Sequence, residues 1–202
     1  MIIPGVSSAL GGPTYAGISI TQRGVAESVV VCTGVGRGGK EVKLPGYERG
    51  RTTVVLMGVA RLGTVVGGFL EREEDEKGNG TSRRSGAAYP SYLPIAIIER
   101  ASMPDQRVVK STLRDVVQAM ESVGEQRPPG MMVVGWAVLG VSGDGEVGRG
   151  VLDDVEGSEG GASMEERDEE RVRKWLGGAR WKVEEGIAGA WEELELLSQR
   201  GA

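Results

Sequence analysis

The chain has 202 residues, no histidine, a single cysteine (Cys32) and a formal net charge of −5 at pH 7. These counts exclude a Ser-His-Asp triad, a Cys-His pair, a histidine-ligated metal, an internal disulfide and a multi-cysteine zinc site. Residues 151–202 hold 14 acidic and 7 basic side chains, so the rest of the chain is only mildly basic. This small positive charge falls short of the excess of basic side chains expected of a nucleic-acid-binding protein.

The first predicted element is a short helix over residues 7–17, with the sequence SSALGGPTYAG. Ser7 or Ser8 can cap its N-terminus, because a serine hydroxyl accepts a backbone hydrogen bond there, and Gly17 can end it. Pro13 either bends this helix or marks its true start, since proline has no N–H to donate.

Short apolar runs then predict a sheet. One of them contains Cys32, which is expected to be a buried strand thiol. A helix is expected after the second run, and another over residues 113–123, where apolar residues recur with helical spacing. Strands that alternate with helices predict an α/β layered fold. The expected strands are residues 28–33, 52–57, 95–98 and 131–134.

Composition divides the chain into three expected parts. Residues 1–141 form the main domain, interrupted at residues 71–91 by a charged, then glycine- and serine-rich segment that is expected to be a solvated insertion. Residues 142–162 form an acidic, glycine-rich linker. Residues 163–202 are expected to form a helical tail.

Two helices are expected in this tail. Ser163 and Glu166 form a capping box that opens the first. The second follows Gly178 and carries an apolar stripe. One interpretation is that the stripe packs on the main domain or on the first helix of the tail. The alternative is that it forms a dimerisation helix or a docking site for another chain. Its members are Val183, Ile187, Ala190, Trp191, Leu194 and Leu197.

The sequence also bears on location. No stretch approaches 18 consecutive apolar residues, and the N-terminus lacks the charged region and long apolar core of a signal peptide. We therefore expect a soluble, cytoplasmic protein without a membrane partner.

Three motifs in unbroken order resemble one family. They are PGVSSALGGPTYAGISITQRG at residues 4–24, LMG at 56–58 and ERASMPDQRVVKSTL at 99–113. Together they resemble the tetrapyrrole methylases, and most closely the uroporphyrinogen-III C-methyltransferases of fungal sirohaem synthases. The resemblance covers residues 3–138 and implies the C-terminal half of the methylase domain, an αβα layer with a mixed sheet. The expected C-terminal helical extension has no counterpart in the family pattern.

The resemblance implies S-adenosyl-L-methionine as cofactor, bound between two αβα halves. Carried over by motif, it places Ser7, Ser8, Met57 and Ala101 beside this cofactor. Small residues near a prolyl-glycyl turn suit close backbone approach to a folded nucleoside, and an unbranched methionine can fill an irregular apolar wall.

The substrate implied by the resemblance is uroporphyrinogen III, a tetrapyrrole with eight carboxylates. Arg23, Arg37 and Arg107 are the candidate partners, because guanidinium matches carboxylate with two hydrogen bonds. Alternatively, Arg107 braces its loop together with Asp105 and Gln106, and Arg37 is a solvated loop charge.

At two points the chain departs from the family pattern. Gln22 stands where the family usually has a histidine, beside Arg23. No carboxylate matches the proposed general base, so the catalytic residues stay unassigned, and Glu99 and Asp105 are expected to brace loops.

The function implied by the resemblance is methylation of uroporphyrinogen III to precorrin-2, a step of sirohaem synthesis. The first half of the methylase domain is missing from this chain, so we expect the chain alone to be inactive. Two alternatives stay open. One is a non-catalytic α/β remnant that binds another protein, and the other is a different precorrin methyltransferase. The resemblance also suggests a homodimer.

Overall fold

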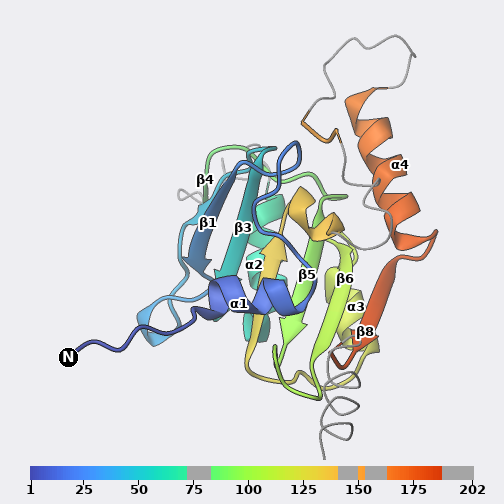
Figure 1. Ribbon diagram of the computed structural model, residues 1–202. Coiled ribbons are helices and arrows are strands. Elements are labelled where there is room, and N and C mark those ends of the chain that lie inside the picture. Colours follow the sequence, from blue (N-terminus) through green and yellow to red (C-terminus); the bar gives the residue numbers. More distant parts are fainter. Residues whose placement is uncertain (72–82, 141–149, 153–162, 188–202) are drawn as a thin grey trace, which may run out of the picture.

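A six-stranded mixed sheet, in the order β1-β3-β7-β5-β6-β8, forms the centre of the computed structural model (Figure 1). The structure describes residues 1–71, 83–140, 150–152 and 163–187. β1 and β3 are parallel, and the other neighbouring pairs are antiparallel. A small parallel pair joins β2 (Leu44–Pro45) to β4 (Arg84–Ser85). The strands of the main sheet are β1 (Ser28–Thr33), β3 (Arg51–Leu56), β5 (Pro94–Glu99), β6 (Arg107–Thr112), β7 (Gly130–Val134) and β8 (Trp181–Glu185).

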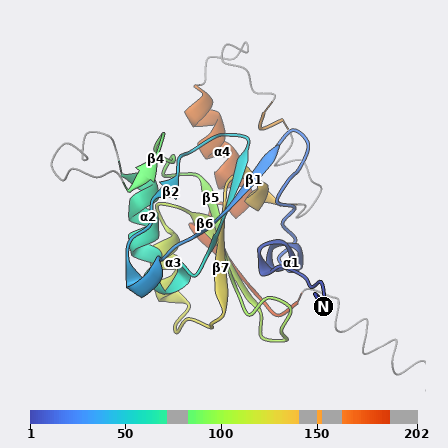
Figure 2. The same ribbon diagram turned by 90° about the vertical axis from the view of Figure 1, so that its left-hand side faces the viewer.

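Helices lie on both faces of this sheet, which confirms the expected αβα layering. Figure 2 shows α2 and α3 together on one face and α1 on the other. α4 lies beside the β6–β8 end of the sheet in Figure 1. The α-helices are α1 (Ser8–Tyr15), α2 (Leu62–Leu70), α3 (Val116–Ser122) and α4 (Met164–Leu176), and short 3-10 turns are η1 (Arg37–Gly39), η2 (Val59–Arg61) and η4 (Trp136–Leu139).

The core follows from the central strands. All six residues of β5 are buried, as expected for a strand with neighbours on both sides and helices on both faces. Phe69 of α2 is fully buried against the ring of Tyr89, with ring centroids 4.4 Å apart. The sequence predicts four strands, and the structure has them as β1, β3, β5 and β7. Each observed end lies within one residue of the predicted end.

The sequence also predicts the first helix. Ser7 is the N-cap of α1, and its hydroxyl accepts a hydrogen bond from the Ala9 amide at 3.3 Å. Pro13 lies inside the helix, and Gly17 follows it with a left-handed φ of 67°. These observations confirm the predicted cap, helix and stop.

One correction concerns the alternation of strands and helices. Residues 107–112 form β6, which pairs antiparallel with β5 as a hairpin, with no helix between the two strands. This segment lies within the motif at residues 99–113, and no strand is predicted there from the sequence. Its residues are fully buried although Arg107, Lys110 and Thr112 are polar, so hydrophobic patterning could not reveal it.

A second correction concerns the expected solvated insertion. Residues 72–82 lie outside the described residues, but Arg84 is 1% exposed, and its guanidinium donates to the carbonyls of Gly68, Glu71 and Gly86. Two of these acceptors lie at or just beyond the last turn of α2, where carbonyl groups lack intrahelical partners. Residues 83–91 are therefore part of the packed domain.

The tail begins as the sequence predicts. The Ser163 hydroxyl accepts from the Glu166 amide at 3.2 Å, and the Glu166 carboxylate accepts from the Ser163 amide at 2.7 Å. This capping box opens α4, and Gly177, with a left-handed φ of 64°, ends it.

The predicted second helix of the tail is wrong where the structure describes it. Residues 181–185 form β8, which pairs antiparallel with β6, and Val183 lies on this strand with 39% of its surface exposed. The outer edge of β6 has backbone N–H and C=O groups that cannot pair with β5. A strand at residues 181–185 pairs with these groups, whereas a helix would leave them unpaired. Ala190, Trp191, Leu194 and Leu197 lie outside the described residues.

α4 is attached to the sheet by an ion pair and by apolar contacts. The Arg49 guanidinium donates two hydrogen bonds to the Asp168 carboxylate, at 2.6 and 2.9 Å, and a third to the Val151 carbonyl. Trp175 and Leu176 are buried in the same core cluster as the sheet residues. The boundaries at residues 141 and 162 stay a prediction.

None of the helices in the described part of the chain combines the length and apolar character that a membrane crossing requires. Within the same residues, no group of three or more Cys, Asp or Glu side chains is arranged to hold a metal ion.

Candidate functional site

Two turns leave the sheet at the same edge, on either side of β7. Leu56, the last residue of β3, is paired with Met131, and Ile98 of β5 is paired with the same Met131. Adjacent strands are about 4.8 Å apart, so the turns after β3 and β5 lie about 10 Å from each other. Met57 begins the first turn and Ala101 lies in the second. The strand register therefore brings two of the predicted cofactor residues to one edge.

The first turn is strained and exposed. Met57 has a φ of 56°, in the left-handed region that methionine rarely adopts, and 65% of its surface is exposed. Gly34, just after β1, allows the close approach: a Cβ there would lie 2.5 Å from the Gly58 Cα. A Cβ on Gly58 would lie 2.9 Å from the Met132 Cε. The two glycines thus let the chain turn so tightly that the Met57 side chain is held out of the sheet.

The second turn is also strained. Arg100 and Ser102 have φ values of 50° and 69°, with Ala101 between them. The Ser102 amide donates to the Gln106 side-chain carbonyl at 3.0 Å. The Arg100 guanidinium donates to the Asp105 carboxylate at 2.8 Å, and this bond holds the pKa of Asp105 below its usual range. Left-handed non-glycine residues cluster at ligand-binding sites, because such strain persists only where surrounding contacts maintain it.

α1 crosses in front of the sheet in Figure 1. A Cβ on Gly12 would lie 2.6 Å from the Met131 sulfur and 3.8 Å from the Ala101 Cβ. The helix therefore packs directly on the strand that separates the two turns. Ser7 and Ser8 at its N-terminus are both exposed. The four predicted cofactor residues thus come from α1 and from the two turns beside it.

An open groove of about 1040 Å³ lies beside this arrangement. Its walls come from the end of α1, from β6 and from the end of β8, and include Tyr15, Gln106, Lys110 and Glu184. Lys110 is 3% exposed and its ammonium group donates to Glu184 at 2.7 Å.

The three predicted arginines do not come together. Arg37 is exposed in η1, which follows β1 at the same edge as Met57. Arg23 is exposed in a tight turn closed by hydrogen bonds between Gln22 and Ala26, before β1 begins. β1 is six residues long, so Arg23 lies about 20 Å from the Met57 edge.

Arg107 is an interior residue, 1% exposed. Its guanidinium donates to the Glu99 carboxylate at 2.6 Å and to the carbonyls of Val123 and Glu125 at 2.7 Å each. These are the contacts of a brace between β5, β6 and the loop before β7. Arg107 therefore braces, as the alternative supposed, but its partners are Glu99 and the loop before β7 rather than Asp105 and Gln106. Glu99 has the bracing role expected for it, and the guanidinium has no face left toward a ligand.

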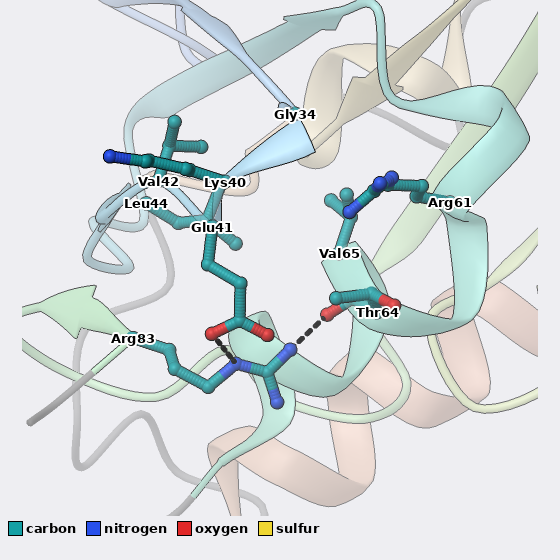
Figure 3. A pocket seen from close by; sticks show the side chains of 9 residues that line it. All are labelled: Gly34, Lys40, Glu41, Val42, Leu44, Arg61, Thr64, Val65 and Arg83. Carbon is teal, nitrogen blue, oxygen red and sulfur yellow. Dashed lines mark hydrogen bonds and ion pairs between the residues drawn. The ribbon is translucent and has the colours of Figure 1, made fainter. Parts of the chain in front are cut away.

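A separate small pocket lies between residues 34–44 and the start of α2 (Figure 3). The Arg61 guanidinium donates to the Gly39 carbonyl at 2.7 Å. The Arg83 guanidinium donates to the Thr64 carbonyl at 2.6 Å and lies 3.8 Å from Glu41. The two arginines hold the loop that carries Arg37 against α2, a role that sequence reasoning missed.

Sequence reasoning also missed Gln106 and the contact between Gly34 and Gly58. The sequence indicates Gln106 only as a member of the ERASMPDQRVVKSTL motif and as a companion of Arg107 in bracing a loop. A glycine directly after each of two predicted strands was a usable signal for close backbone approach.

Cys32 is half-buried in β1, and its burial raises the pKa of the thiol from 9.0 to about 11. Two units correspond to roughly 100-fold less thiolate at a given pH. We expect a thiol-reactive disulfide reagent at pH 8 to label the folded chain roughly 100-fold more slowly than the urea-unfolded chain. The chain has no other cysteine, so the signal has one source, and equal rates in both states would contradict the assigned environment.

Comparisons with known proteins point to one family. The family model described as Tetrapyrrole (Corrin/Porphyrin) Methylases matches residues 1–117. A probable uroporphyrinogen-III C-methyltransferase of Schizosaccharomyces pombe is 40% identical over 136 residues, which cover 67% of this chain and 24% of that protein. A uroporphyrinogen-III C-methyltransferase of Methanocaldococcus jannaschii is 34% identical over 139 residues, covering 68% and 51%.

A solved structure of uroporphyrin-III C-methyl transferase from Thermus thermophilus, complexed with S-adenyl homocysteine, is 29% identical, covers 68% of this chain and 51% of that one, and has a TM-score of 0.44. The matched part of this chain thus spans about half, or less, of the length of these relatives.

Proposed function

This chain belongs to the tetrapyrrole methylase family, and on that premise we propose that it forms one side of an S-adenosylmethionine site in a uroporphyrinogen-III C-methyltransferase. The reaction gives precorrin-2 for sirohaem. The observation that carries the proposal is the pair of left-handed turns, at Met57 and around Ala101, beside α1 at one edge of the sheet.

The residues of this edge suit a folded nucleoside. Gly34 and Gly58 bring two backbone segments close together, and Gly12 lets α1 approach the Met131 side chain. Segments without side chains also let a nucleoside approach the backbone closely. Met57 presents an exposed, unbranched apolar side chain next to them. Ser8 and Ala101 add small side chains from either side. We assign Ser7, Ser8, Met57 and Ala101 to the cofactor contact.

The proposed cofactor supplies an electrophilic methyl group on a sulfonium centre. In the transfer, a pyrrole carbon of the reduced macrocycle forms a bond to this methyl carbon. The C–S bond breaks, S-adenosylhomocysteine leaves, and one proton is lost from the macrocycle. The contribution of this chain is to bind and orient, since holding two reactants in line removes most of the entropic cost of their encounter.

For the carboxylates of the macrocycle we propose Arg37, which is exposed at the Met57 edge. Arg23 is an exposed second candidate that requires a substrate or partner surface reaching the other end of β1. The contacts of Arg107 favour its bracing role. We also propose that the protein acts in the cytoplasm, as the sequence leads us to expect, and that it forms a homodimer, on the basis of the family resemblance.

The alternatives differ in what they predict for the cofactor. A non-catalytic domain that binds another protein would not bind S-adenosylhomocysteine, whereas a different precorrin methyltransferase would bind it and differ only in substrate. Titration of the folded chain with S-adenosylhomocysteine in a calorimeter therefore tests the proposed function. Saturable binding supports it, and absence of binding by a chain with a cooperative unfolding transition contradicts it.

Met57→Asp is expected to weaken S-adenosylhomocysteine binding about 10-fold, because an aspartate would place a charge in the apolar wall of the site. Calorimetric titration of both proteins measures the change. Val29→Asp is the matched control, since Val29 is also an exposed apolar residue (37%) but lies near the start of β1. Unchanged affinity in the Met57 variant, or an equal loss in the control, would remove Met57 from the site.

A further inference from the structure

The side chain of Gln106 joins the strained turn around Ala101 to α1. Its carbonyl oxygen accepts from the Ser102 amide at 3.0 Å, and its amide group donates to the Tyr15 carbonyl, at the end of α1, at 3.2 Å. Gln106 is 2% exposed. One buried side chain therefore satisfies backbone groups on two of the three segments that carry the proposed cofactor residues, α1 and the turn around Ala101.

The tail holds the backbone of this same residue. The Gly186 amide, just after β8, donates to the Gln106 carbonyl at 2.7 Å. Next to it, Glu185 accepts two hydrogen bonds from the Arg127 guanidinium, at 2.6 and 3.2 Å. Arg127 in turn donates to the Asp105 carbonyl at 3.3 Å and, through its backbone amide, to Glu99 at 2.8 Å. Both ends of the 99–106 segment are thus fixed by contacts that include the end of β8.

We infer that Gln106 is a positioning residue for the cofactor site, and that the β8 strand of the tail holds it in place. This inference rests on the proposed function. β8 lies outside residues 1–117, the part that the family model matches. The contact that supports the Gln106 backbone therefore comes from the tail, a part of the chain for which the family pattern gives no role.

The physical reason is the strain in the turn. Arg100 and Ser102 both occupy left-handed conformations, which for residues other than glycine are less stable than extended ones. A turn of this kind relaxes when its fixing contacts are lost. Ala101 lies between the two strained residues, so relaxation would move the backbone that is proposed to contact the nucleoside.

Gln106→Met tests the inference in the full chain, because methionine keeps the length of the side chain and removes both hydrogen bonds. We expect amide hydrogen exchange at Ser102 to be at least about 10-fold faster, since this amide loses its acceptor. We expect S-adenosylhomocysteine affinity to fall about 10-fold in calorimetric titration.

Glu185→Ala tests the tail. We expect its affinity for S-adenosylhomocysteine to fall about threefold, because the Arg127 contact is partly exposed. Glu184→Ala is the matched control: it removes the same charge from the neighbouring residue, which contacts Lys110 instead. Both variants lose an ion pair of β8, so the melting temperature falls in both, and only Glu185→Ala is expected to lose affinity.

The outcomes separate two failures. If the wild-type chain does not bind S-adenosylhomocysteine, the proposed function is overturned and this inference with it. If wild type binds and Gln106→Met binds equally well, or exchanges the Ser102 amide at the wild-type rate, this inference alone is overturned. An equal loss of affinity in the Glu184 and Glu185 variants would overturn the part assigned to β8.

Discussion

Arg107→Met is expected to lower the free energy of unfolding by about 3–5 kcal/mol, because it leaves the Glu99 carboxylate buried without its partner. Both side chains are 1% exposed, so water cannot replace the lost guanidinium. The substitution also removes the donors to the Val123 and Glu125 carbonyls. Urea unfolding followed by circular dichroism measures the change.

Two further variants make the Arg107 result specific. Arg114→Met, where 59% of the side chain is exposed, is expected to change the free energy of unfolding by less than about 0.5 kcal/mol. The double variant Arg107→Met with Glu99→Met is expected to recover part of the loss, since an apolar pair often replaces a buried ion pair at little cost. A loss below about 1 kcal/mol in the single variant would contradict the brace.

Asp168→Ala is expected to lower the free energy of unfolding by about 2–3 kcal/mol, because it breaks two charged hydrogen bonds to Arg49. Asp168 is 1% exposed, whereas 22% of the Arg49 side chain is exposed, so water compensates the guanidinium in part. Urea unfolding measures the loss. The smaller expected effect relative to Arg107 follows from this difference in burial.

The matched control for Asp168 is Glu169→Ala, one residue along the same helix. Half of the Glu169 side chain is exposed and its contact to Arg114 is 4.0 Å long, so the expected change is below about 0.5 kcal/mol. A separate early unfolding transition in Asp168→Ala would show that α4 detaches from the sheet first. Equal behaviour of the two variants would mean that the Arg49 contact does not hold the helix.

The parts of the fold that the sequence predicts are those specified by local patterns. The strands β1, β3, β5 and β7 are apolar runs, α1 has its serine cap and its glycine stop, and α4 has its capping box. Each of these signals lies within a few residues of the element that it specifies. The family motifs in addition single out Met57 and Ala101, whose turns the strand register places on either side of β7.

The parts that the sequence does not reveal depend on partners far along the chain. β6 carries Arg107 and Lys110 inside the protein, and its burial becomes intelligible only with Glu99 and Glu184 in place. The apolar stripe that begins at Val183 has helical spacing, yet residues 181–185 form a strand because the β6 edge offers backbone partners. Long-range pairing of this kind overrides local propensity.

The same limit applies to the candidate site. Met57 and Ala101 are identified by motif, but the register that places them on either side of Met131 is a property of the sheet. Gln106 lies within a motif, yet its role depends on contacts with Tyr15 and Gly186, which are distant in the sequence.

The pairing of β8 with β6 also has a consequence for synthesis of the protein. A ribosome makes the chain from the N-terminus, so β6 is complete long before residues 181–185 emerge. Throughout that interval the outer edge of β6 has unpaired backbone groups, which another nascent chain or a chaperone could meet. The last described strand therefore closes the sheet late, and release before residue 185 would leave an edge open to aggregation.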